Sequence, residues 1–377
     1  MLNLVDTPNL MVTTPYYNDS HQRFQAYVRH YVDTYLLPHA QEWEAAGEAP
    51  LTARLKFAKS GLAFLDVPRE YRPEDMMTVA GIPFEDLDVF RELILMDEMA
   101  GIPSGVPLTL AGASNVGAPP IFTAGTTEQK RRWLPGLFTW ETSFCLAITE
   151  PTAGSDVIHY VVNGCKKWVT GAPWATHMTT AVRMGEKGQG DISLLVVPLT
   201  LPGVTIRKIH NSGHNAGGSS WVILEDRFIL TADCNRQARL CLSEALQHAH
   251  DRETFGKTLA SHQIIRHKLI TLAREIEGHW AWLEQIAYHV KVHGWQTKDI
   301  ASRIALAKIQ GGRIVEQAVR ESQQIHGGIG YERGMTMTEQ ISRDLRLKVI
   351  GGGSEEILTD LAWREEHKRA NDQSSKL

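Results

Sequence analysis

Apolar residues recur every three or four positions over most of the first 140 residues, a spacing that predicts amphipathic helices. The pattern is continuous over residues 21–44, 51–60 and 84–100. Residues 108–123 are small and apolar but interrupted by glycine and proline, which indicates a buried helix with a broken end. We therefore predict an all-α domain over residues 19–140.

At Phe144 the pattern changes to short β-prone runs separated by turns that contain Gly, Pro or Asn. The runs cover residues 144–148, 160–162, 167–170, 192–197, 204–209 and 220–224. They predict a compact antiparallel β domain over residues 141–226.

Helical periodicity returns in the last third of the chain. Small residues recur on one stripe that ends at His248 and Arg252, and such a stripe predicts close packing against a neighbouring helix. Its small members are Cys234, Ala238, Cys241 and Ala245. Long helices are expected over 262–292 and 298–325. A last helix should begin after Ser354, a good N-cap residue. The prediction is a helical domain over 227–368 and a flexible polar tail over 369–377.

The stretch 144–156, FCLAITEPTAGSD, joins the first two domains. A buried strand should end at Pro151, because proline cannot donate to a sheet ladder. The small residues that follow offer backbone N–H groups and hydroxyls that can cradle a flat polar ring or a phosphate. An ordinary strand-to-turn junction is the alternative.

Composition narrows the class of protein. The chain has 377 residues, 43% hydrophobic and 22% charged, as expected for a globular protein with two or three domains. A net charge of −4 gives no reason to expect nucleic-acid binding. No apolar run approaches the roughly 20 residues of a membrane span, and the N-terminus does not resemble a signal peptide. The four cysteines form no CxxC pair and indicate a reducing compartment.

The chain ends in Ser375-Lys376-Leu377. A C-terminal SKL is an address read by the peroxisomal import receptor. We therefore expect a peroxisomal protein, with a cytoplasmic location as the alternative.

Five motifs together resemble the acyl-CoA dehydrogenase flavoenzymes, and they occur in that family's order. They are FCLAITEPTAGSD, GCKKWVTG (164–171), DRETFGK (251–257) with Gln263, QIHGGIGY (324–331) and SRDLR (342–346). The resemblance implies an α domain, a β domain and a C-terminal four-helix bundle. It also implies FAD as the cofactor and a homodimer or homotetramer.

Matching positions imply the FAD contacts. Ile148, Thr149 and Ser155 would lie along the flavin ring and its ribityl-phosphate side, with Trp168 and Thr170 on the other side of the ring. Other residues would hold the adenine-diphosphate half, partly across a subunit interface, with Ser354 near the same cofactor. These are Arg252, Thr254, Phe255, Gln263, Gln324 and Gly328. The types suit the roles, because tryptophan stacks on planar rings and arginine matches a pyrophosphate.

The implied reaction is α,β-desaturation of an acyl-CoA thioester. A carboxylate removes an α-proton while a hydride leaves Cβ for flavin N5, and the acceptor of the electrons is an electron-transfer flavoprotein or O₂. Many family members carry the base before the last helix, but Gly352 occupies that position here. The isovaleryl- and long-chain acyl-CoA dehydrogenases place it before an arginine at the start of an earlier helix. That position is Asp226, with Glu225 second; a solvated turn is the alternative.

Two segments look short for the family, after Val157 and after Asp226. They border the implied acyl pocket and the flavin edge. Another flavin reaction on the same fold, such as nitroalkane or acyl-CoA oxidation, therefore remains open, and so does a catalytically silent flavin-binding or scaffold protein. The histidines around 248–250 and 262–267 lack acidic partners at ligand spacing, so no metal site is predicted. Nucleophile-elbow and Walker motifs do not occur in the sequence.

Overall fold

The computed structural model describes residues 14–148, 166–183, 192–218, 227–295, 297 and 300–374. Contacts between Cα atoms divide the chain into two compact units, and each is built from separate stretches of sequence. Unit 1 contains residues 1–33, 88–103 and 226–377, and unit 2 contains residues 34–87 and 104–225. The chain therefore passes from one unit to the other four times.

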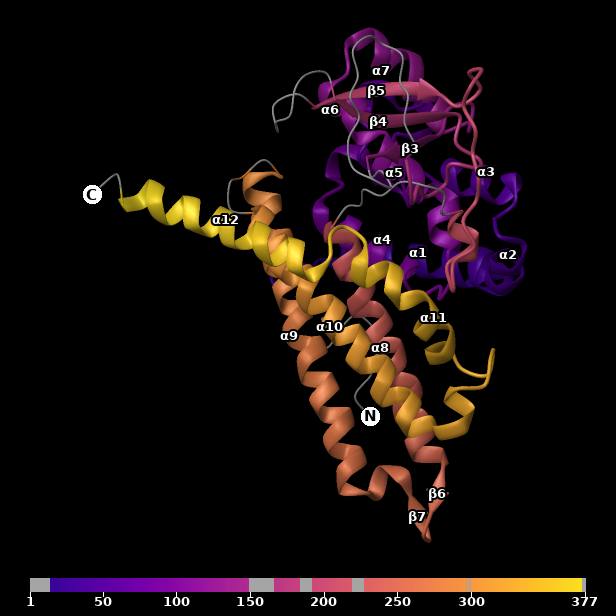
Figure 1. Ribbon diagram of the computed structural model, residues 1–377, viewed down its shortest axis with the longest axis vertical. Coiled ribbons are helices and arrows are strands. Elements are labelled where there is room, and N and C mark those ends of the chain that lie inside the picture. Colours follow the sequence, from indigo (N-terminus) through magenta and orange to yellow (C-terminus); the bar gives the residue numbers. More distant parts are fainter. Residues whose placement is uncertain are drawn as a thin grey trace. The chain divides into compact units, whose positions relative to one another are not determined.

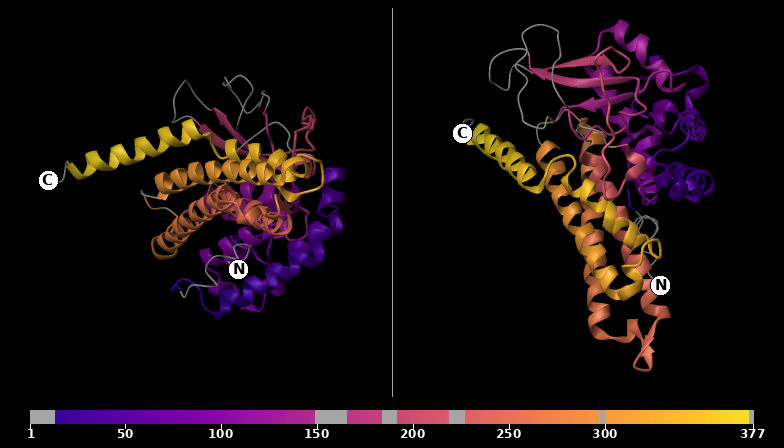
Figure 2. Two further views of the ribbon diagram at one scale, coloured as in Figure 1. Left: turned by 90° about the horizontal axis from the view of Figure 1, so that it is seen from below. Right: turned by 45° about the vertical axis from the view of Figure 1, so that its right-hand side comes forward.

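Unit 1 is a helical bundle in which α8, α9 and α10 run side by side (Figures 1 and 2). A two-stranded hairpin joins α8 to α9, and α12 packs on α10. The elements are α1 (Asp19–Tyr31), α4 (Val89–Met99), α8 (Arg227–Asp251), β6 (Glu253–Thr254), β7 (Lys257–Thr258), α9 (Gln263–His293), α10 (Ile300–His326), α11 (Met337–Ile350) and α12 (Glu355–Ser374).

Small buried side chains allow α8 and its neighbours to approach closely. Cys234, Ala238, Cys241 and Ala245 are all fully buried and belong to one apolar cluster with residues of α9, α10 and α11. The close packing predicted from their spacing is confirmed. A second apolar cluster joins α4 to α8, α9 and α10 and includes Phe90, Phe228 and Trp280.

Polar side chains also lie inside unit 1. Arg239 of α8 is 1% exposed, pairs with Asp97 of α4, and lies 5.2 Å from the ring centroid of Trp280. Arg236 reaches the same carboxylate at 3.5 Å. Three charged side chains at this depth are tolerated only because they are paired and hydrogen-bonded. The pairing therefore fixes α4 against α8.

The helix starts of unit 1 are capped by short polar side chains. Asn18 caps α1, and Asp88 caps α4 by accepting from the N–H of Arg91 at 3.3 Å. His21 and Lys291 also bind the Asp88 carboxylate, at 3.1 and 2.7 Å. Burial raises the pKa of Asp88, but these two hydrogen bonds outweigh it and hold that pKa well below its usual value. Asp88 thus links α1, α4 and α9.

Unit 2 contains short helices and a small sheet. Its elements are α2 (Ala40–Ala46), α3 (Leu51–Lys59), the strand pair β1 (Thr78–Val79) and β2 (Ile82–Pro83), α5 (Ala113–Gly117), α6 (Pro119–Ala124), α7 (Thr127–Trp133), β3 (Phe144–Ala147), β4 (His177–Arg183) and β5 (Ile192–Pro198). The carboxylate of Glu44 connects stretches that are far apart in the sequence. It accepts hydrogen bonds from the backbone N–H groups of Gly105 at 2.9 Å and Ala216 at 3.0 Å.

The sheet of unit 2 differs from the predicted one in its pairing. β4 and β5 are antiparallel as expected, but β3 and β4 are parallel, with Phe144 opposite His177. The stretch that forms β4, HMTTAVR, was not predicted, because its polar threonines weaken the apolar alternation. Residues 204–209 form no strand and contain one isolated bridge at Lys208. The runs at 160–162 and 220–224 lie outside the described residues.

The helix ends also correct the sequence predictions. The predicted helix over 21–44 is divided at a π-helical turn, Val32–Leu36, and continues as α2. α8 ends at Asp251, one residue before the predicted end of its stripe at Arg252. α12 continues to Ser374, so residues 369–374 are helical rather than a flexible tail. Within the described ranges, no helix is long and apolar enough to span a bilayer.

Candidate functional site

The carboxyl end of β3 is held by two side chains of unit 2. Lys166 Nζ donates to the carbonyl of Ile148 at 3.1 Å and to that of Ala181 at 2.8 Å. Thr180 Oγ1 donates to the carbonyl of Ala147 at 3.0 Å. The half-buried Ile148 is therefore fixed where the first flavin contact is predicted. Four other predicted site residues lie outside the described residues: Thr149, Ser155, Glu225 and Asp226.

Trp168 is presented by a strained loop of unit 2. Its φ is +70°, a left-handed conformation that costs a non-glycine residue roughly 1–3 kcal/mol. The side chain is 37% exposed, and Lys167 Nζ lies 4.9 Å from its ring centroid. Thr170 follows, half-buried, and the N–H of Gly171 donates to Gly217 at 3.2 Å. A half-exposed aromatic ring held in this way can stack on a planar ligand.

Phe255 lies at the tip of the hairpin between α8 and α9 in unit 1 (Figure 1). Phe255 and Gly256 both have positive φ, +53° and +75°, as the central residues of a type I′ turn do. Phenylalanine is a poor residue for that conformation, and this side chain is 97% exposed. Phe255 therefore presents a large apolar surface to solvent at the tip of the hairpin.

The residues beside this hairpin connect it to the end of α10. Arg252 is exposed, and its N–H donates to the carbonyl of His248 at 2.9 Å. The ring of His248 lies 4.6 Å from that of His326, at the end of α10. Burial, His326 and Arg252 together lower the pKa of His248. Arg252 is thus brought to the same end of the bundle as Gly328, which is also exposed.

Two further predicted residues lie on this side of unit 1. Thr254 is half-buried, and its Oγ1 is 3.3 Å from Nε2 of His262. Gln263 is exposed on the first turn of α9. Neither carries a charge, so both can contribute hydrogen bonds to a bound ligand without changing the local charge.

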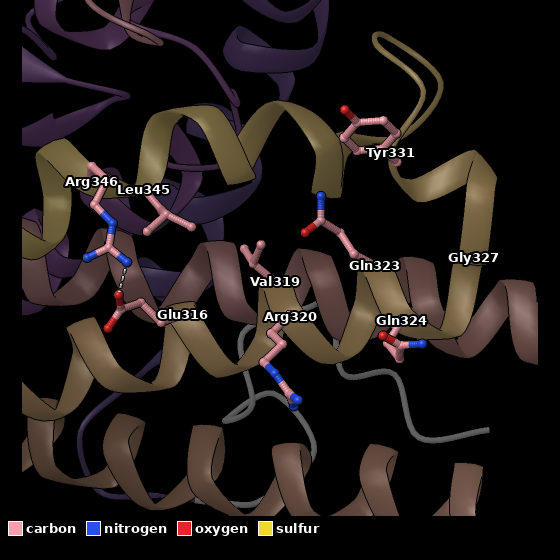
Figure 3. Close-up of a pocket in the computed structure, with 9 residues that line it drawn as sticks. All are labelled: Glu316, Val319, Arg320, Gln323, Gln324, Gly327, Tyr331, Leu345 and Arg346. Atoms are coloured by element: carbon pink, nitrogen blue, oxygen red, sulfur yellow. Dashed lines mark hydrogen bonds and ion pairs between the residues drawn. The ribbon is translucent and has the colours of Figure 1, made fainter.

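Gln324 lines a cavity of about 440 Å³ between α10 and α11. In Figure 3, Val319 and Gln323 point toward α11, whereas Arg320 and Gln324 point away from it. Tyr331 lies at the rim and is 88% exposed. The cavity therefore begins at the end of the bundle where Arg252 and Gly328 lie, and its wall offers amide and guanidinium groups.

Ser354 lies elsewhere in unit 1. It precedes α12, and the neighbouring carbonyl of Gly353 accepts from Lys308 of α10 at 3.2 Å. Lys308 is 16 residues before Gln324 on the same helix, which corresponds to about 24 Å at 1.5 Å per residue. The structure thus brings Arg252 and Gln324 to one end of the bundle and leaves Ser354 far from that end.

Lys166 is a positioning residue that was not predicted from the sequence. Its ammonium group ties the end of β3 to β4, directly before the loop that presents Trp168. The available signal was its place inside the GCKKWVTG motif, two residues before the tryptophan. Among the described residues, no group of three His, Cys, Asp or Glu side chains could hold a metal ion.

The helical bundle, the small sheet and the exposed aromatic, amide and guanidinium groups are features of a mainly helical protein with a small β domain, and the groups are of the kind that bind an aromatic, phosphate-bearing cofactor. Three family models match successive parts of the chain. They are acyl-CoA dehydrogenase N-terminal domain over residues 18–141, middle domain over 145–227, and C-terminal domain over 219–365. The chain belongs to the acyl-CoA dehydrogenase family, as its motifs had indicated.

Relatives and solved structures agree with this family. The chain is 36% identical to acyl-CoA dehydrogenase AFT10-1 of Alternaria alternata, over 94% of this chain and 93% of the relative. It is 34% identical to acyl-CoA dehydrogenase apdG of Emericella nidulans, over 93% and 92% of the two chains. A probable acyl-CoA dehydrogenase from Mycobacterium abscessus has the same fold, with a TM-score of 0.81, 26% identity, and 93% of this chain and 99% of that chain covered.

These findings identify the protein as an FAD-dependent, acyl-CoA dehydrogenase-like oxidoreductase that acts on a CH–CH group. The alignment with the Alternaria relative is 404 positions long although it covers only 94% of the 377 residues of this chain. It therefore contains positions at which this chain has no residue. That finding agrees with the two segments that look short in the sequence.

Proposed function

We propose that the protein desaturates the α,β bond of an acyl-CoA thioester. The observation that carries this proposal is the match of all three family domains in order, together with relatives named acyl-CoA dehydrogenase over nearly the whole chain. The exposed, strained Phe255 beside Arg252 supports it, since that surface suits a bound cofactor.

The residues present fit FAD. Arg252 supplies a permanently ionised, planar cation for the diphosphate, and the amides of Gln263 and Gln324 can donate to or accept from the adenine half. Trp168 can stack on the flavin ring. When bound, FAD accepts the hydride that leaves the substrate. The chain itself has to hold the cofactor and the thioester, exclude water, and remove the α-proton.

Asp226 is our proposed base, with Glu225 as the second choice. The α-proton of a thioester is weakly acidic, so a carboxylate has to lie within hydrogen-bond reach of it and be shielded from water. The proposal rests on the sequence position before Arg227 and on Gly352, which cannot accept a proton where other family members carry the base.

We also propose that FAD is held by two copies of the chain. Ser354 follows Gly353, whose carbonyl binds Lys308, and Lys308 lies about 24 Å along α10 from Gln324. A single unit 1 therefore offers two separate sets of contacts, and a homodimer or homotetramer would bring one set from each subunit to the same cofactor. The exposed Phe255 would be covered in such an assembly.

The purified full-length protein is expected to be yellow, to sediment as a dimer or larger, and to lose its 450 nm flavin absorbance when one acyl-CoA is added without oxygen. Short, branched and long acyl-CoAs should be tested in parallel, because the pocket-forming segments do not reveal the acyl length. Readmission of air then tests the acceptor: rapid recovery of colour indicates O₂, and slow recovery indicates an electron-transfer flavoprotein.

A yellow protein that no acyl-CoA bleaches would contradict the proposed reaction while leaving the cofactor in place. Nitroalkanes should then be added, since bleaching by them would indicate a different oxidation on the same fold. A colourless protein that does not take up FAD would contradict the cofactor assignment and favour a scaffold role. A monomer that retains FAD would contradict the two-subunit site.

We propose a peroxisomal location, which rests on Ser375-Lys376-Leu377 alone. A fluorescent protein fused to the N-terminus of the full chain should appear in peroxisomes. The same fusion without the last three residues should remain in the cytoplasm. Identical distributions of the two fusions would show that the tripeptide is not the targeting signal.

A further inference from the structure

A second cavity lies in unit 1, and its lining includes none of the residues assigned to the cofactor. It has a volume of about 360 Å³, within the range of small-molecule sites. Its walls come from the C-terminal part of α9, the N-terminal part of α10 and α12, which Figure 2 shows leaving the bundle beside these helices. The lining residues are Gln285, Ile286, Tyr288, His289, Val292, His293, Ile300, Arg303 and Arg369.

The lining combines an apolar floor with a cationic rim. Ile286 and Ile300 are 2% and 6% exposed and form the floor, beside the half-exposed ring of Tyr288. Two arginines and two histidines complete the wall, and none of the described residues that line it is a carboxylate. A cavity of this kind favours an anion that carries an apolar or aromatic body.

The two histidines lie next to each other in this wall. Their ring centroids are 4.8 Å apart, and Nε2 of His289 lies 3.1 Å from the hydroxyl of Thr297. His293 is exposed, one turn further along α9. Each imidazole carries at least one N–H donor whichever tautomer it adopts, so both side chains add hydrogen-bonding capacity to the wall.

One acid of α12, three residues before Arg369, is already engaged. Glu366 of α12 lies 3.9 Å from Nη1 of Arg369 and accepts from the hydroxyl of Ser302 at 2.6 Å. Within the part of the chain that the structure describes, no carboxylate pairs with Arg303. Arg369 is therefore partly neutralised, whereas the guanidinium of Arg303 keeps its full charge at the cavity.

We infer that this cavity binds a phosphomonoester, with the dianion at Arg303 and Arg369 and the body of the ligand on the floor beside Tyr288. Arginine is suited to this group because its planar fork donates two parallel hydrogen bonds to phosphate oxygens. The ligand is a soluble organic phosphate or the headgroup of a phospholipid. Its binding is independent of the flavin reaction.

The test is calorimetric titration of the full-length protein saturated with FAD, so that the cofactor site cannot accept the probe. AMP supplies a phosphomonoester on an aromatic body, adenosine lacks the phosphate, and vesicles containing phosphatidic acid present the same group on a lipid. AMP or the vesicles should bind, and adenosine should not. Arg303→Gln should weaken that binding at least about tenfold, the loss expected for one charge-assisted contact.

Arg364→Gln is the matched control, because Arg364 is an exposed arginine of α12 that does not line the cavity. It should bind the probes like the unmodified protein, and flavin reduction should be unchanged in both variants. Binding of AMP identifies a soluble ligand, and binding of the vesicles alone identifies a headgroup. Failure of all phosphate probes, or equal binding to the unmodified protein and to both Arg303→Gln and Arg369→Gln, would overturn the inference.

Discussion

Replacement of Asp226 by asparagine is expected to abolish flavin reduction by an acyl-CoA while FAD stays bound. Asparagine has nearly the same shape but cannot accept the α-proton. Loss of a general base typically costs 10²–10⁴-fold, so the anaerobic rate of bleaching should fall by at least about a hundredfold. Stopped-flow absorbance at 450 nm measures that rate, and the spectrum before mixing reports whether FAD is still bound.

Glu225→Gln is the matched control, since it removes the neighbouring carboxylate in the same way. Its rate should stay within a fewfold of that of the unmodified protein. If Glu225→Gln is the slow variant, the base is Glu225. If neither substitution slows bleaching, neither carboxylate is the base, and another residue of the chain has to remove the proton. Asp226→Glu tests whether the position of the carboxylate matters, because it lengthens the side chain by one methylene group. A displacement of about 1 Å can change the rate of such a reaction about a hundredfold.

Asp97→Ala is expected to destabilise the protein by about 3–5 kcal/mol, the range found when one partner of a buried ion pair is removed. The substitution leaves Arg239, 1% exposed, and Arg236, 7% exposed, without their shared carboxylate. The desolvation of both guanidinium groups is then no longer offset by this carboxylate, although Arg239 keeps its hydrogen bond to Asn235 at 3.2 Å. Equilibrium urea denaturation of the FAD-saturated proteins, followed by circular dichroism, measures the change in the free energy of unfolding.

A surface pair provides the control for this prediction. Asp360→Ala removes the partner of Arg364 on α12, where both side chains are more than half exposed. Such pairs contribute about 0–1 kcal/mol, so the urea midpoint should hardly move. Equal midpoints for Asp97→Ala and Asp360→Ala would contradict the importance of the buried cluster. Partial recovery in the double variant Asp97→Leu with Arg239→Met would support it, because apolar residues of similar volume need no partner.

The sequence predicted the helical parts of the chain well, because their apolar stripes are long and end at clear caps. The small-residue stripe of α8 even predicted close packing that the structure confirms. The strands of the sheet were harder to predict from the sequence. β4 contains Thr179 and Thr180, which are almost fully buried but polar, and their hydroxyls donate to backbone carbonyls. A pattern of apolar and polar residues cannot show that the hydroxyl of a buried threonine has a hydrogen-bond partner.

The candidate site was predictable as a set of residues but not as an arrangement. Motifs pointed to Trp168, Arg252 and Gln324, whereas the distance between Ser354 and Gln324 follows only from the folded length of α10. The strain at Phe255 was also hidden, since a residue letter carries no φ angle. The buried cluster of Asp97 and Arg239 was missed because 142 residues separate the two partners.

The fourfold passage of the chain between the two units has a consequence for synthesis on the ribosome. The apolar face of α4 includes Phe90, which packs against Trp280 of α9, 190 residues later in the sequence. At roughly 5–20 residues per second, α4 leaves the ribosome about 10–40 seconds before that partner exists. Until α8 and then α9 are synthesised, its apolar face and the carboxylate of Asp97 lack their native neighbours from those helices. Nascent chains that stop before α9 are therefore the species that a holdase chaperone should bind most strongly.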